Sequence, residues 1–213
     1  MSDNALVIGA SGIIGSATAR SLVGQGWQVA GLARKPVEQE GVTPVVADLL
    51  DTDSLKAALA DSAPTHVYIT TWSRQATEAE NIRVNAAMVR NVLDVLSTKG
   101  SVRHVALVTG LKHYLGPFEA YGKGTLPKTP FREEQGRLDV ENFYYAQEDE
   151  VFAAAKRDGF TWSVHRPHTI TGVALGNAMN MATTLRSMRR SAKPPAGRFA
   201  SPGRGSSGTA SPT

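Results

Sequence analysis

The chain of 213 residues contains no cysteine, which excludes disulfides, a thiolate nucleophile and thiolate-based metal sites. It also lacks any apolar run near the ~20 residues that a membrane-spanning helix needs. The N-terminus does not have the pattern of a signal peptide, because Asp3 precedes the first apolar stretch and a glycine turn follows that stretch at once. These absences predict a cytoplasmic protein that does not associate with membranes.

Acidic residues are absent from one end of the chain. Six Lys and Arg residues and no Asp or Glu lie from Arg186 onward, so residues 1–185 carry a net charge of −2 while the whole chain carries +4. The folded part is therefore mildly acidic, and no nucleic-acid partner is expected. The basic end is rich in Arg, Pro, Gly and Ser, and Phe199 is its only aromatic residue. This composition predicts a folded domain over residues 1–185 and a disordered tail over residues 186–213.

A short apolar run near the N-terminus leads into three regularly spaced glycines. The segment ALVI at residues 5–8 is followed by Gly9, Gly12 and Gly15, and an amphipathic stretch continues from there. Strand, glycine turn and helix in this order are the context of a dinucleotide-binding fingerprint. In that fingerprint Gly9 permits a tight turn, Gly12 a close approach of the backbone to a pyrophosphate, and Gly15 close packing of the helix on the strand. An ordinary strand–turn–helix is the alternative interpretation.

Apolar runs and helical patterns alternate along the rest of the chain. Further strands are predicted at residues 28–33, 42–47, 66–70, 102–109 and 161–166. Helices are predicted over residues 78–96 and 142–157, and a shorter one begins after Asp51 or Asp53. This alternation predicts an α/β fold with a doubly wound parallel sheet of the Rossmann type. Residues 110–140 are too long for an ordinary connection in a compact domain, which indicates a functional loop.

Two adjacent cations follow the second predicted strand. Ligands of doubly wound sheets bind at the carboxyl ends of the strands, and NAD enzymes usually have an acidic residue after the second strand to bind the ribose. Arg34 and Lys35 stand there instead, and two cations suit the 2′-phosphate of NADP. A solvated basic pair is the alternative.

The ends of the third and fourth predicted strands supply further candidates. Asp48 and Leu49 follow the third strand and either flank the adenine or belong to a helix cap nearby. Thr71 and Trp72 follow the fourth strand, where Trp72 is either a pocket wall near the nicotinamide or a core residue.

The predicted helix at residues 142–157 carries two adjacent tyrosines, Tyr144 and Tyr145. Most short-chain dehydrogenases have their catalytic Tyr and Lys as Y-x-x-x-K on one helix face. In this chain the residues four positions after the tyrosines are Glu148 and Asp149. Without that lysine, the helix taken alone indicates a non-catalytic relative of these enzymes.

Longer strings of residues carry a more specific signal. They are TGLKHYLGPF from Thr109, RLDVENFYYAQED from Arg137 and TWSVHRP from Thr161, with THVYITTW and TEAEN upstream. With these motifs, residues 5–185 resemble the progesterone 5β-reductase and iridoid synthase family of extended, atypical short-chain dehydrogenases/reductases. The resemblance implies a Rossmann fold, NADP(H) as the cofactor, and reduction of the C=C bond of α,β-unsaturated carbonyl compounds.

The same resemblance implies roles for individual residues. In that family the catalytic lysine has moved from the tyrosine helix to the loop after the fifth strand, where it corresponds to Lys112, and the catalytic tyrosine corresponds to Tyr144. The family's cofactor lies against residues that match Ser11, Gly12, Ile13, Arg34, Lys35, Asp48, Leu49, Thr71, Tyr144 and Ile170. The sequence departs from the family pattern at His168, a position that is commonly Gly, and at Thr171, commonly Phe. Both departures lie near the expected nicotinamide end.

A phenol beside an ammonium suits the reduction of an enone. Hydride that arrives at the β-carbon moves negative charge onto the carbonyl oxygen, and a phenol aimed at that oxygen stabilises the enolate. A nearby ammonium favours the charged form of a phenol, so Lys112 can act from any strand end that lies close to Tyr144. Each residue alone has a plainer explanation, as a solvated loop lysine or as an aromatic packed on the sheet. No metal site is expected, because no ligand spacing is found among the histidines His104, His113, His165 and His168.

Members of the resembled family continue well beyond the point that matches Leu185, so this chain is expected to lack the region that covers the substrate. The tail at residues 186–213 then resembles an out-of-frame or spurious extension, with a natural basic linker as the alternative. The expected function is NADPH-dependent reduction of a small enone or enal, by a monomer or a homodimer. A non-catalytic NADP-binding regulator and an inactive fragment remain open as alternatives.

Overall fold

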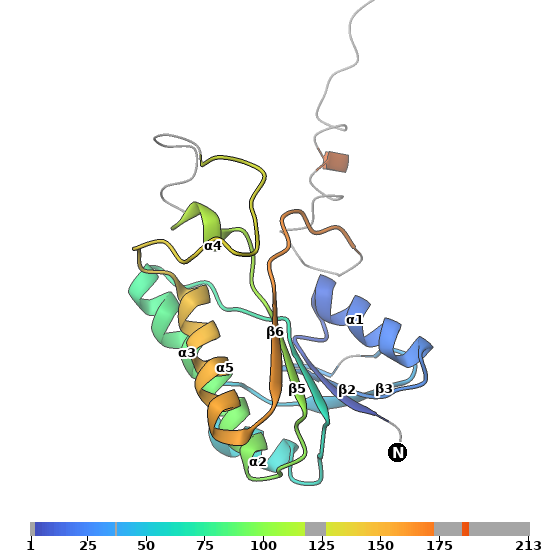
Figure 1. Ribbon diagram of the computed structural model, residues 1–213. Helices are drawn as coiled ribbons and strands as arrows, with labels where there is room; N and C mark the ends of the chain where they lie inside the picture. Colours follow the sequence, from blue (N-terminus) through green and yellow to red (C-terminus); the bar gives the residue numbers. More distant parts are fainter. Residues whose placement is uncertain (1–2, 37, 118–126, 173–184, 188–213) are drawn as a thin grey trace, which may run out of the picture.

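The chain folds around one parallel sheet in the computed structural model, which describes residues 3–36, 38–117, 127–172 and 185–187 (Figure 1). The six strands lie in the order β3-β2-β1-β4-β5-β6. They are β1 Asn4–Ile8, β2 Gln28–Ala33, β3 Val42–Val46, β4 His66–Ile69, β5 His104–Val108 and β6 Thr161–His165. The described helices are α1 Ile13–Gly24, α2 Thr52–Ala58, α3 Glu78–Ser97, α4 Lys112–Leu115 and α5 Phe143–Asp158. The predicted doubly wound sheet of the Rossmann type is confirmed.

Helices cover the two faces of the sheet unequally. Figure 1 shows α1 on one side of the sheet and α3 and α5 together on the other. Because side chains alternate across a strand, β1 serves both layers. Its Leu6 and Ile8 belong to the larger apolar cluster with α3 and α5, and Ala5 and Val7 belong to the smaller cluster under α1.

The long helix α3 is buried more widely than its sequence pattern predicts. The expected apolar stripe contains Ile82, Ala86, Val89, Leu93 and Leu96, and all but the half-buried Ile82 are buried. Four further apolar residues of α3 are also buried: Val84, Met88, Val92 and Val95. The reason is that α3 contacts α5 and α2 and also shares an apolar cluster with residues of the sheet, so more than one of its faces is covered. A single-stripe pattern does not anticipate a second contact face.

The glycine turn between β1 and α1 has the predicted local geometry. Gly9 has a φ of +84°, a region that favours glycine, and its N–H donates to the Leu32 carbonyl at 2.9 Å. Gly15 lies directly against this turn, because a Cβ at its position would stand 2.2 Å from the Gly9 carbonyl oxygen. The close helix–strand packing expected of Gly15 is thus confirmed. It brings the first turn of α1 to the carboxyl end of β1.

Gly15→Ala is expected to lower the free energy of unfolding by about 1–3 kcal/mol, because the added methyl would overlap backbone atoms. Gly24→Ala is the matched control at the other end of α1, where a Cβ would meet nothing within 4 Å. That control should be neutral or stabilise the chain by about 0.5–1 kcal/mol. Urea unfolding of both variants measures the difference. Equal midpoints would show that the turn shifts to accept the methyl group.

The N-cap of α2 decides an alternative left open by the sequence. Asp51, and not Asp53, is the N-cap of α2, where its Oδ1 accepts from Asp53 N at 3.1 Å and from Ser54 N at 3.0 Å. Asn142 is the N-cap of α5.

Part of the predicted loop and nearly all of the predicted tail lie outside the described residues. Residues 110–140 contain the unpredicted four-residue helix α4, and residues 118–126 lie outside the described residues. Of the tail at 186–213, only Arg186 and Ser187 are described. The division at residue 185 stays a prediction. Within the described part of the chain, no helix is both long enough and apolar enough to cross a bilayer.

Candidate active site

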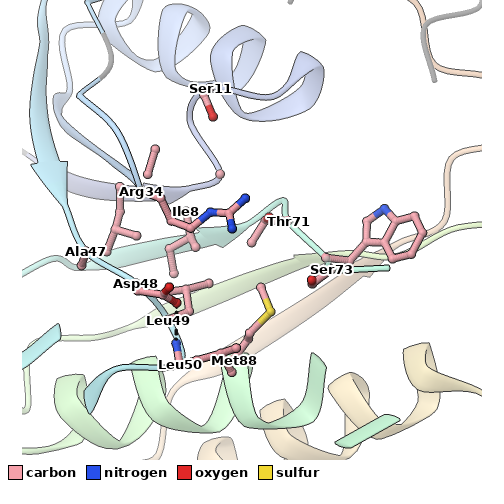
Figure 2. Close-up of a pocket in the computed structure, with 14 residues that line it drawn as sticks. Ile8, Ser11, Arg34, Ala47, Asp48, Leu49, Leu50, Thr71, Ser73 and Met88 are labelled. Carbon is pink, nitrogen blue, oxygen red and sulfur yellow. Dashed lines mark hydrogen bonds between the residues drawn. The ribbon is translucent and has the colours of Figure 1, made fainter. Parts of the chain in front are cut away.

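A cleft of about 170 Å³ opens at the carboxyl ends of β1 to β4. The strand order changes direction here, because β1 lies between β2 and β4, and ligands of doubly wound folds bind at such a point. The predicted cofactor residues that line it together are Gly9, Ser11, Arg34, Asp48, Leu49 and Thr71. Figure 2 shows the Arg34 guanidinium extending across the cleft towards Thr71. The lining also includes Ser73 and Met88, which the sequence did not suggest.

Side chains in the cleft have specific local roles. Asp48 is not a helix cap, because its Oδ1 accepts a hydrogen bond from Leu50 N at 2.9 Å. Trp72 is half-buried, and its place relative to a nicotinamide stays a prediction. It lines the cleft, and its ring stacks on Phe143 with centroids 5.2 Å apart. Asn85 in α3 holds the following turn, since it accepts from Ser73 N at 2.7 Å and donates to Ser73 O at 2.8 Å.

The other predicted cofactor residues lie around this cleft and do not line it. Gly12 is the N-cap of α1, and Ile13 is its first residue. Lys35 is exposed next to Arg34. Ile170 is half-buried in the segment after β6, which returns to α1: a Cβ on Gly172 would stand 2.5 Å from Ile13 Cγ2. The two departures from the family pattern, His168 and Thr171, are both exposed.

The first turn of α1 is suited to an anion. Gly12 provides no capping side chain, and no acidic residue lies in the first turn of this 12-residue helix. The N–H groups at a helix start and the helix dipole favour negative charge.

The two tyrosines of α5 have different surroundings. Tyr145 is buried, and its hydroxyl donates to the His113 carbonyl at 2.6 Å and accepts from Leu138 N at 3.0 Å. The Tyr144 hydroxyl lies by the end of β5, where a Cβ on Gly110 would stand 3.4 Å from it. Tyr145 therefore links the backbone at His113 to the backbone at Leu138 by hydrogen bonds. Tyr144 lies at the carboxyl edge of the sheet.

Lys112 begins α4 and is almost completely buried, with 1% of its side chain exposed. Its Nζ lies 2.5 Å from Glu78 Oε2 and 4.5 Å from the centre of the Phe143 ring. Its backbone carbonyl accepts from Asn142 Nδ2 at 3.0 Å. Asn142 precedes Tyr144 by two residues and also caps its N–H at 3.0 Å. The structure thus brings Lys112 to the first turn of the helix that carries Tyr144.

Glu148 occupies the position that is lysine in Y-x-x-x-K, and it is buried in an ionic network. Its carboxylate lies 3.0 Å from Arg137 Nη2 and 3.3 Å from Arg166 Nη2, and 1% of its side chain is exposed. His113 Nδ1 lies 3.9 Å away. Burial lowers the pKa of His113 from its ordinary value of 6.5 and so favours the neutral ring. The two arginines are therefore the main cationic partners of Glu148.

Among the described residues, no group of three or more His, Asp or Glu side chains is arranged to hold a metal ion. His113 is structural, since its Nε2 lies 3.2 Å from the Gln135 carbonyl oxygen.

A family model matches most of this chain. The model for the NAD dependent epimerase/dehydratase family covers residues 5–194. The chain belongs to this family. Dependence on a nicotinamide dinucleotide is therefore established at the level of the epimerase/dehydratase family, and the choice between NAD and NADP is not.

Two curated members of this wider group confirm the resemblance seen in the motifs. The (S)-8-oxocitronellyl enol synthase ISY1 of Nepeta cataria is 39% identical over 193 residues, which are 85% of this chain and 50% of the relative. The 3-oxo-Delta(4,5)-steroid 5-beta-reductase of Arabidopsis thaliana is 40% identical over 195 residues, with the same coverage. This epimerase/dehydratase-family chain thus spans about half the length of the curated relatives it matches.

Solved structures of the same fold include nucleotide-sugar epimerases. UDP-glucose 4-epimerase from Brucella ovis, in complex with NAD, superposes with a TM-score of 0.63 at 20% identity, over 84% of this chain and 55% of the epimerase. The enzyme WbmH of Bordetella bronchiseptica, in complex with NAD+, superposes with a TM-score of 0.65 at 16% identity. The match covers 89% of this chain and 64% of WbmH. At these identities the likeness supports the epimerase/dehydratase fold and nothing more specific.

Proposed function

We propose that this chain forms the dinucleotide-binding half of an NADPH-dependent reductase of the C=C bond in α,β-unsaturated carbonyl compounds. The observation that carries the proposal is the position of the buried Lys112 ammonium, 4.5 Å from the ring centre of Phe143, the first residue of the helix that also carries Tyr144. The names of the relatives, an enol synthase and a 5-beta-reductase, support the same class. The activity of the whole protein belongs to the proposal, because the chain spans about half of those relatives.

The cleft and the glycine turn fit a nicotinamide dinucleotide. The uncapped first turn of α1 suits the pyrophosphate, and Gly12 adds no side chain that would stand in its way. Asp48 and Leu49 border the place where an adenosine would lie, and Arg34 extends over it with its positive charge available to a 2′-phosphate (Figure 2). When bound, NADPH supplies the hydride.

The residues of this chain stabilise the charge that hydride transfer creates. Tyr144 donates a hydrogen bond to the substrate's carbonyl oxygen, which gains negative charge as the β-carbon receives hydride. The Lys112 ammonium favours that charge from the adjacent element. The stacked rings of Trp72 and Phe143 give this end of the site an apolar wall, which limits the access of water. The enolate then takes a proton at its α-carbon, which gives the saturated carbonyl compound.

A deuterium-transfer experiment tests the proposed function. The purified chain is loaded with NADPH that carries deuterium at the transferable position and is mixed with a small enone or enal, and the products are analysed by mass spectrometry. We expect measurable NADPH binding and formation of the saturated carbonyl compound with deuterium on its β-carbon.

The other possible products discriminate between reaction classes. A deuterated alcohol would show carbonyl reduction and refute the C=C assignment. Binding of NADPH with no reduced product would favour a non-catalytic NADP-binding regulator or an inactive fragment. A small-molecule partner, a cytoplasmic location and a homodimer stay predictions.

Arg34→Ala is expected to remove most of the preference for NADPH over NADH. The loss of charge-assisted hydrogen bonds to the 2′-phosphate should weaken NADPH binding about tenfold to a hundredfold while NADH binding changes little. Arg20→Ala is the matched control, because Arg20 is an exposed cation on α1 that does not line the cleft. Calorimetric titration of each variant with both dinucleotides measures the effect. Equal affinity of the unmodified chain for NADPH and NADH would contradict the assignment.

A further inference from the structure

Lys112 and Tyr144 lie on two different helices, so their distance is not fixed by the geometry of a single helix. In Y-x-x-x-K, one helix fixes the distance between the two side chains, because residues four apart are neighbours on its surface. In this chain Lys112 lies in α4 and Tyr144 in α5, and the intervening residues include 118–126, which are not described. Because the two residues lie on different elements, contacts between those elements help to set their relative position.

Glu78 closes a ring of contacts that includes both elements. Its Oε2 lies 2.5 Å from Lys112 Nζ, and its Oε1 accepts from Phe143 N at 2.7 Å. The Lys112 carbonyl accepts from Asn142 Nδ2 at 3.0 Å, and Asn142 is bonded covalently to Phe143. The ring thus runs from α3 to α4, then to the first turn of α5, and back to α3.

The chemistry of the ring requires a carboxylate at position 78. A buried ammonium needs a counter-charge, and the backbone N–H at the start of α5 needs an acceptor. Glu78 offers one oxygen to each, and 15% of its side chain is exposed. A glutamine has a single acceptor oxygen, so its amide N–H₂ would face one of the two donors.

We propose that Glu78 is a positioning residue, which holds the Lys112 ammonium and the first turn of α5 in register so that Lys112 acts beside Tyr144. This role rests on the proposed reductase function, since it presumes that these two residues act together. Neither the apolar pattern of α3 nor the glycine fingerprint assigns a role to Glu78.

Acylation of lysine amines tests the positioning role without any turnover. The full chain is treated briefly with an amine-reactive ester, and mass spectrometry gives the acylation of Lys112 relative to Lys56, whose side chain is 66% exposed. Glu78→Gln should raise this ratio about tenfold or more, because the ammonium loses a charge-assisted partner. Glu80→Gln is the matched control. Glu80 lies in the same turn of α3 and pairs only with the exposed Arg83 among the ion pairs of the described residues.

Two further measurements separate positioning from plain stability. Glu78→Asp keeps the charge on a shorter side chain, so its Lys112 acylation should lie between those of the unmodified chain and Glu78→Gln, and it carries the test if Glu78→Gln does not fold. Glu78→Gln should also lower the rate of hydride transfer while the Kd for NADPH stays unchanged. A merely structural role would lower the thermal midpoint and leave Lys112 acylation, measured well below that midpoint, as it is in the unmodified chain.

The outcomes for the two proposals are distinguishable. Equal Lys112 acylation in the Glu78→Gln and Glu80→Gln chains overturns the positioning role, whether or not the unmodified chain reduces enones. An unmodified chain that reduces no enone, combined with raised Lys112 acylation in Glu78→Gln, refutes the proposed function alone and supports the ring of contacts.

Discussion

Tyr144→Phe is expected to lower the rate of enone reduction by ~10²–10³, the usual effect of losing one donor to a developing oxyanion. Tyr145→Phe should retain much more of the rate and lose stability instead. The Tyr145 hydroxyl is bonded to the His113 carbonyl and to Leu138 N, and both backbone groups would be left without it. The loss of a buried partner costs about 1–3 kcal/mol.

Single-turnover kinetics of both tyrosine variants measures the loss of rate, and thermal unfolding measures the loss of stability. Kinetics alone would not suffice, because a destabilised chain also loses activity. The assignment fails if Tyr144→Phe keeps the rate of the unmodified chain. It also fails if Tyr145→Phe is the slower enzyme at a temperature where both variants are fully folded.

Glu148→Lys, which restores Y-x-x-x-K from Tyr144, is expected to destabilise the chain by about 3–5 kcal/mol and to give no gain in activity. The new ammonium would lie between the Arg137 and Arg166 guanidiniums in a buried position. Breaking a buried ion pair in this way leaves uncompensated charge in a region of low polarity. The segment that contains Arg137 should lose its attachment to α5 as well.

Asp149→Lys is the matched control, because Asp149 is the next residue and also pairs with Arg137, but its side chain is 61% exposed. The same change of charge there should cost no more than about 1 kcal/mol. Urea unfolding of the two variants compares them directly. Equal free energies of unfolding for the Glu148→Lys and Asp149→Lys chains would show that the ion pairs of Glu148 do not hold the segment around Arg137 on α5.

The parts of the fold that the sequence predicted correctly depend on local patterns. The short apolar run at residues 28–33, which lies between turns, predicts a strand, and β2 has these bounds. The tight turn at Gly9 and the close packing at Gly15 follow from residue type and spacing. The cleft residues at the strand ends, such as Arg34 and Thr71, follow from topology once the strands are known.

The parts that the sequence did not predict depend on contacts between distant elements. Nothing local indicates that Glu78 pairs with Lys112, or that Glu148 pairs with Arg137 and Arg166. Charged residues are usually exposed, so a pattern of charge on a helix predicts a solvated face. Only the packing of α3, α4 and α5 turns these particular charges inward. Lys112 and Tyr144 themselves were found through resemblance and not through spacing.

The closure of the ring through Glu78 has a consequence for the order in which the molecule assembles. The residues that line the cleft all lie between Ile8 and Met88, whereas the contact from Glu78 to Phe143 joins positions 65 residues apart. Closing the loop between Glu78 and Phe143 lowers the entropy of the chain, and the contacts that form when α5 docks offset this loss. A chain made from its N-terminus onward therefore completes the residues of the nucleotide cleft first. The phenol and the ammonium come together only when α5 has been synthesised and has docked.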